Sequence, residues 1–178
     1  MHEDIKEFLW QRSRTSLSME RLSAIVLETP FFISDLLDVC TNVEDSEGNW
    51  RSAWLMYKVA DENPILLQAY APRLISFFIS KYPQCSDGLL RGLLRIIAAV
   101  EYSEDLCGEL LDACAQIYKK QKYAKAVRVN AMNIIGNIVC RYPELKAEFE
   151  PEFDLLATYD EKSVAAAARN QLKRLRRI

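Results

Sequence analysis

Residues 51–60 read RSAWLMYKVA, and three later stretches repeat their pattern of small and large apolar residues: LRGLLRIIAA at 90–99, VNAMNIIGNI at 129–138 and AAARNQLKRL at 166–175. The third place of each stretch holds a small residue, and these residues are Ala53, Gly92, Ala131 and Ala168, at intervals of 39, 39 and 37 residues. A large residue follows four places on, one turn along the same face of an α-helix. The pattern predicts four equivalent helices, each with one apolar face.

Further helices are predicted between these stretches, because proline residues and capping residues divide the chain into short segments. The expected helices are 3–13, 18–28, 31–42, 48–62, 64–82, 86–101, 103–121, 124–142, 144–158 and 161–177. Ser18, Ser86 and Asp160 stand where an N-cap is needed. Pro72 should bend or divide the 64–82 helix, since proline lacks the amide hydrogen. The short connections make successive helices antiparallel neighbours.

A period of about 40 residues with two helices is typical of HEAT and armadillo repeats. The segments around Arg51-Ser52-Ala53-Trp54, Asn130-Ala131-Met132-Asn133 and Ala168-Arg169-Asn170 resemble second helices of HEAT repeats. The resemblance covers about residues 31–177. It implies an all-α fold, a right-handed α-α superhelix or solenoid of about four to five antiparallel helix pairs, in a single domain over residues 1–178. The alternative is a helical bundle without repeats.

Composition narrows the class of protein. The chain has 178 residues, is 50% hydrophobic and carries a formal net charge of -2, which disfavours duplex nucleic acid as its main partner. Charged residues interrupt positions 1–10, so we expect no secretion signal there, and Arg95 interrupts the apolar run 93–100, so we expect no membrane span. Five cysteines, an odd number, favour reduced thiols and a cytoplasmic protein.

The sequence offers little material for catalysis. His2 is the one histidine, which leaves no base for a nucleophilic triad. Cys107 and Cys114 lie seven residues apart, but no third ligand stands at metal-binding spacing. The glycines form neither a Walker A loop nor a dinucleotide fingerprint. We therefore expect a protein without enzymatic activity, metal or cofactor.

The second helices of a HEAT stack line its concave side, and the positions opposite the apolar stripe predict a partner-binding groove. These positions include Arg51, Leu55, Lys58, Leu90, Leu94, Ile97, Asn133, Asn170, Lys173 and Arg177. A groove with basic ends and an apolar middle suits another protein, or an acidic or amphipathic peptide, bound by a monomer. The alternative is that helix 86–101 is buried on both sides.

Trp50 is a candidate aromatic platform, because an aromatic ring near a cation can stack on a base, a peptide or a methylated amine. HEAT-like alkylpurine DNA glycosylases are similar in architecture and place aromatic and basic residues along their groove. Trp50, Arg51 and Trp54 match that arrangement. The slightly acidic charge balance and the lack of an assignable catalytic aspartate make nucleic acid the less favoured partner.

Overall fold

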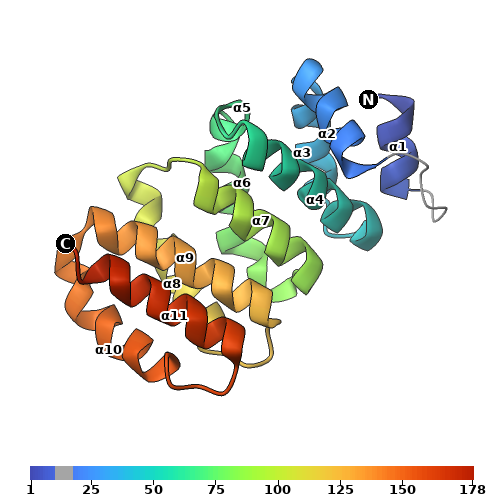
Figure 1. The fold of residues 1–178 in the computed structure, drawn as a ribbon. Coiled ribbons are helices and arrows are strands. Elements are labelled where there is room, and N and C mark those ends of the chain that lie inside the picture. The colour runs from blue at the N-terminus through green and yellow to red at the C-terminus, as the bar shows by residue number, and fades with distance from the viewer. Residues whose placement is uncertain (11–17) are drawn as a thin grey trace. The chain divides into compact units, whose positions relative to one another are not determined.

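The computed structural model describes residues 1–10 and 18–178, and every regular element in this part of the chain is helical (Figure 1). The α-helices are α1 (Glu3–Trp10), α2 (Met19–Glu28), α3 (Phe32–Cys40), α4 (Ser46–Glu62), α5 (Ile65–Gln68), α6 (Ala71–Lys81), α7 (Asp87–Ala99), α8 (Glu104–Tyr118), α9 (Lys125–Arg141), α10 (Lys146–Leu156) and α11 (Lys162–Leu175). Two 3-10 turns, η1 (Tyr82–Gln84) and η2 (Pro143–Leu145), complete the set. The all-α class expected from the repeated stretches is confirmed.

Local signals set most helix boundaries. The Ser18 and Ser86 hydroxyl oxygens accept hydrogen bonds from the amides of Arg21 and Leu89, so both predicted N-caps are confirmed. Pro72 lies in the first turn of α6, where no amide hydrogen is needed, and α5 and α6 together replace the single 64–82 helix. The first expected helix reached residue 13, but positions 11–13 lie outside the described residues.

Two of the helix starts that differ from the prediction have a visible cause in their capping residues. α4 begins at Ser46 rather than residue 48, because Asp45 caps it and accepts a hydrogen bond on Oδ1 from the Gly48 amide at 2.9 Å. Asp160 does not cap α11. The N-cap residue is Glu161, whose side chain makes no capping bond; its carboxylate instead pairs with the guanidinium of Arg128.

The chain divides into two compact units, Met1–Ser103 and Glu104–Ile178. In the first unit α4 contacts α1, α2, α3 and α7, and α6 also contacts α7. In the second unit α9 contacts α8 and α11, and α10 contacts α11. Each unit therefore places a long second helix, α4 or α9, at its centre, and the single domain over residues 1–178 stays a prediction.

The small residues of the repeated stretch lie where second helices meet. A Cβ built on Gly92 of α7 would stand 2.6 Å from the Cβ of Ala53 on α4, so the two helices touch through their backbones. In the second unit, Ala131 and Ala168 are fully buried on α9 and α11, which contact each other. Close helix approach requires such residues, which explains why they recur at one helical position.

Candidate functional site

The apolar middle of the predicted groove is buried. Leu55, Leu90, Leu94 and Ile97 are each 0% exposed. Because α4 has five helical neighbours and α7 contacts both α4 and α6, positions opposite the repeated stripe are also covered. The expectation that these four side chains line an exposed groove is therefore wrong, and their burial matches the alternative in which the helix is covered on both sides.

The two predicted cations of the first unit have structural contacts. Arg51 donates from Nη1 to the carbonyl oxygens of Phe8 and Leu9, at 3.2 and 3.3 Å, and its Nη2 lies 3.2 Å from Oε2 of Glu47. It thereby satisfies carbonyl groups in the last turn of α1, which have no partner within that helix. Lys58 is half-buried. Arg51 therefore stabilises the end of α1 and is a poor candidate for steering a partner.

The remaining four groove positions lie in the second unit and stay accessible. Asn170, Lys173 and Arg177 are exposed on or just after α11. Asn133 of α9 is half-buried, and its Oδ1 accepts a hydrogen bond from Nε2 of Gln171 at 2.8 Å. The ten predicted positions thus separate into a largely buried set in the first unit and a largely exposed set in the second.

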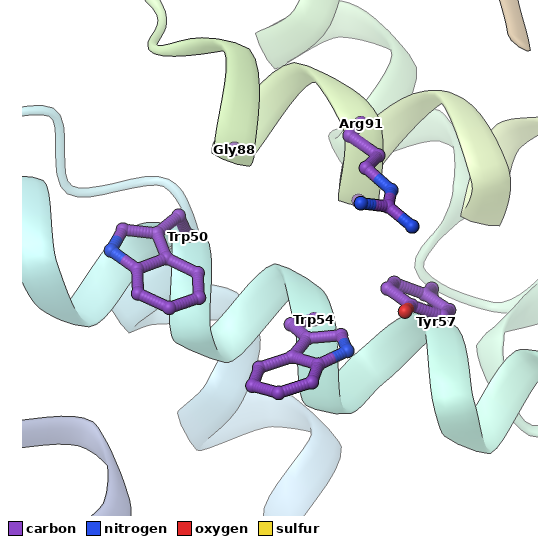
Figure 2. Close-up of a pocket in the computed structure, with 6 residues that line it drawn as sticks. Trp50, Trp54, Tyr57, Gly88 and Arg91 are labelled. Carbon is purple, nitrogen blue, oxygen red and sulfur yellow. The ribbon is translucent and has the colours of Figure 1, made fainter. Parts of the chain in front are cut away.

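An aromatic pocket of about 330 Å³ lies between α4 and α7 (Figure 2). Its lining residues are Trp50, Trp54, Tyr57, Gly88, Arg91 and Gly92. The three aromatic residues follow one another at intervals of four and three along α4, so they share one helical face. Its volume is within the range of small-ligand and peptide side-chain sites.

The two indoles form the floor of this aromatic pocket. The Trp50 and Trp54 ring centroids are 6.0 Å apart with an interplanar angle of 23°, and both side chains are half-buried. Phe8 of α1 supports Trp54, with ring centroids 5.9 Å apart. The rings are therefore held in place from one side while part of their surface remains accessible.

Glycine on the facing helix leaves the space above the indoles open. Gly88, near the start of α7, is exposed, and a Cβ there would lie 3.3 Å from the Cβ of Trp50. Any larger side chain at this position would project over the Trp50 ring. The aromatic pocket is therefore open over Trp50 because residue 88 lacks a side chain.

The charged wall of the aromatic pocket is cationic. Arg91 is exposed, and in Figure 2 its side chain extends from α7 toward Tyr57. The Tyr57 ring also lies 4.4 Å from Cζ of Arg95, whose guanidinium is paired with the Asp61 carboxylate at 2.8 Å. None of the lining residues is a carboxylate. The pocket can therefore stack on an apolar or planar group and bind an adjacent negative charge.

Trp50 was the platform expected from the sequence. Tyr57, Gly88, Arg91 and Gly92 were not assigned to a site with it from the sequence. The spacing of Trp50, Trp54 and Tyr57 was a usable signal, since it places three aromatics on one face. Gly88 and Arg91 carry no comparable signal, because only packing of α7 on α4 brings them to the tryptophans.

Charge is divided between the helices of the second unit. α8 and α10 together carry eight acidic residues and one basic residue. α9 and α11 carry seven basic residues and no acid. Two hydrogen bonds hold α9 and α11 in parallel register, Gln171 to Asn133 and Arg174 to Asn137, each 2.8 Å long. The second helices of this unit therefore present a basic layer.

No metal centre is found in residues 1–10 and 18–178, because no three His, Cys, Asp or Glu side chains gather there. Within the same ranges, no helix combines the length and apolar character needed to cross a bilayer. The five cysteines are free thiols, and Cys40, Cys107 and Cys114 are buried. Their burial agrees with the packing role expected from the sequence.

Thiol reactivity provides a first test of this packing. Burial raises the pKa of Cys40 to about 12 and that of Cys85 to about 11, and it also raises the pKa of Cys114. Only the thiolate reacts, so at pH 8 we expect these three residues to be labelled at least ~10-fold more slowly in the native protein than after unfolding. Peptide mapping by mass spectrometry after a timed pulse of iodoacetamide gives the rate for each residue. Rapid native labelling of Cys40 or Cys114 would contradict the buried positions.

Comparison with protein families places the chain in a known class. A family model described as HEAT repeat domain matches residues 11–175. Searches of curated proteins and of solved structures returned no match. The family match covers nearly the whole chain, including the repeated stretches and both units. The chain belongs to the HEAT repeat domain family.

Proposed function

We propose that this protein is a non-enzymatic binding module that holds a short segment of another protein in the aromatic pocket of its first unit. The observation that carries the proposal is the half-exposed Trp50–Trp54 pair, supported from below by Phe8 and left open above by Gly88. Aromatic side chains in partly desolvated pockets contribute much of the binding energy at protein interfaces. HEAT repeats commonly serve as protein-interaction scaffolds, which agrees with this assignment.

An extended segment fits the spacing of the indoles. In a β-strand, side chains two residues apart point to the same side and are about 6.6–6.8 Å apart. The Trp50 and Trp54 centroids are separated by 6.0 Å, so two alternate apolar side chains of the segment can each cover one indole. We expect an adjoining carboxylate of the segment to pair with Arg91 of the pocket lining, whose guanidinium suits bidentate pairing. The preferred segment therefore has two alternating apolar residues followed by an acid.

A nucleobase is the second candidate occupant, because bases also stack on aromatic rings and phosphates pair with arginine. The same residues, Trp50, Trp54 and Arg91, support this alternative. Glycosylase chemistry fits less well, since the pocket lining offers no carboxylate to act as a base. The row of aromatic residues on α4 also ends at Tyr57. This residue is buried and offers little surface on which a further base could stack.

Peptide display followed by affinity measurement tests the proposal. Extended peptides of the form apolar-X-apolar-X-Glu, with tryptophan, phenylalanine or proline at the apolar places, are selected on the intact protein. We expect Trp50→Ala to weaken the selected peptide at least ~10-fold by isothermal titration calorimetry, because it removes half of the floor. Gly88→Leu should weaken it similarly by filling the pocket. Phe31→Ala, an exposed aromatic residue of the same unit away from the pocket, serves as the matched control and should change the affinity less than ~2-fold.

The same variants separate the two occupants. A dodecamer of oligothymidine provides the single-stranded nucleic-acid probe. Tight binding of this oligomer that is lost in Trp50→Ala, with no peptide selected, would favour the nucleobase. Peptide binding that survives both Trp50→Ala and Gly88→Leu would place the binding site elsewhere on the chain.

A further inference from the structure

The basic layer of the second unit contains cations with different partners. Arg128 is buried and paired with Glu161, and Arg174 donates to Asn137 and Gln171. Arg176, just after α11, pairs with Glu150 and Asp154 of α10. These three arginines join elements of the unit together and contribute little free positive charge to its surface.

The remaining cations of α11 form an exposed row, which we call the α11 stripe. It comprises Lys162, Arg169, Lys173 and Arg177, with Ala166 and Asn170 between them, and all six are exposed. No ion pair joins any of these four cations to an acid of the described residues, although Arg169 donates to the Ala157 carbonyl oxygen at 2.9 Å. Lys162 and Lys173 are eleven residues apart on α11, which is about 16 Å, and Arg177 follows in the turn after the helix.

We infer that the α11 stripe binds an acidic segment of a partner protein in extended conformation. Arg169 and Lys173 are four residues apart on α11, which is about 6 Å along the helix, and Arg177 follows four residues later in the turn after it. Carboxylates at every second residue of an extended chain are spaced about 6.6–6.8 Å apart. Three consecutive cations can thus pair with three alternating acids. This surface lies in the second unit, and its assignment is independent of the aromatic pocket.

The surface beside the stripe favours a polypeptide over a nucleic acid. The accessible positions on α9 include Val129, Asn130, Asn133 and Asn137, which are half-buried and uncharged. A phosphate backbone would be better matched by cations on both helices. The exposed cations of α9, Lys125 and Arg141, stand instead at its two ends, and the acids of α8 and α10 keep the unit from presenting a uniformly positive field.

A pair of labelled peptides of equal composition tests the inference. The probe is a fluorescein-labelled 12-residue peptide with glutamate and serine alternating, and the comparison peptide has six glutamates followed by six serines. Fluorescence anisotropy with the intact protein is recorded from low to physiological salt. We expect the alternating peptide to bind at least ~3-fold more tightly, and Lys173→Glu/Arg177→Glu to weaken it at least ~10-fold. Both affinities should fall with added salt, since exposed charges are screened.

A matched charge control and two competing probes make the test decisive. Arg21→Glu/Lys81→Glu introduces the same change in net charge at exposed positions of the first unit and should alter the affinity less than ~2-fold. An equal loss of affinity in both double variants would overturn the inference, because only net charge would then matter.

Tighter binding of a duplex oligonucleotide that depends on Lys173 and Arg177 would assign the stripe to nucleic acid. Salt-sensitive self-association abolished by the same double variant would assign it to the acidic helices of a second copy. Lys173→Gln/Arg177→Gln, with circular dichroism as a check on folding, excludes misfolding as the cause of lost binding.

Discussion

Leu94→Glu is expected to lower the free energy of unfolding by several kcal/mol. The Leu94 side chain on α7 is 0% exposed, so the introduced carboxylate would lose its hydration. Circular dichroism melting and urea titration measure the effect. The variant should melt well below the parent protein or fail to accumulate as folded protein.

Ala99→Glu is the matched control for this change, because it places the same carboxylate on the exposed last residue of α7. We expect it to change stability by less than about 1 kcal/mol. If Leu94→Glu melted like this control, Leu94 would have to be accessible, and the groove deduced from the repeat register would return as a binding surface. A large loss of stability in Leu94→Glu, with none in Ala99→Glu, supports the buried position of Leu94 on α7.

Gly92→Ala is expected to destabilise the protein by about 2 kcal/mol, although alanine is the better helix former. The added methyl group would lie 2.6 Å from Cβ of Ala53 and 3.0 Å from its carbonyl carbon. Both neighbours are fixed to the backbone of α4, so relief requires the two helices to move apart. Their separation would expose part of the core that α4 and α7 share.

Gly108→Ala is the same substitution in an open position. A Cβ at residue 108 of α8 would have no neighbour within 4 Å. Alanine there should stabilise the helix by up to about 1 kcal/mol through its higher propensity. Urea unfolding of the two variants should therefore give shifts of opposite sign. A stabilising Gly92→Ala would contradict the close approach of α4 and α7.

Much of the helical architecture could be predicted because its signals are local. Ser18 and Ser86 cap the helices that follow them, and Pro72 separates α5 from α6, since each acts on backbone groups within a few residues. Asp160 failed as a predicted cap for a reason that lies further away. The helix begins one residue later, at Lys162, and its N-cap residue is Glu161, which pairs with Arg128, 33 residues distant in the chain.

The candidate sites were less predictable, because accessibility depends on which elements cover a side chain. Arg51 follows Trp50 in the sequence and looked available to a partner, but α1 brings its last carbonyl groups onto the guanidinium. Trp54, named as a site residue only for its match to the HEAT-like glycosylases, lies beside Trp50 on the floor of the pocket. Lys173 and Arg177 are exposed, and their place in a partner-binding groove stays a prediction.

The sequence by itself determined that this chain is helical and that its helices recur with a period of about 40 residues. Helix propensity, capping and apolar periodicity are properties of residues near one another in the chain, so they can be recognised in the sequence without the tertiary structure. Only the tertiary structure decided which faces of those helices reach solvent. Leu90 and Leu94 are buried while Trp50 remains half-exposed, because burial depends on helices that are distant in sequence and packed against them. The aromatic pocket likewise exists only where α7 places Gly88 and Arg91 opposite the tryptophans of α4.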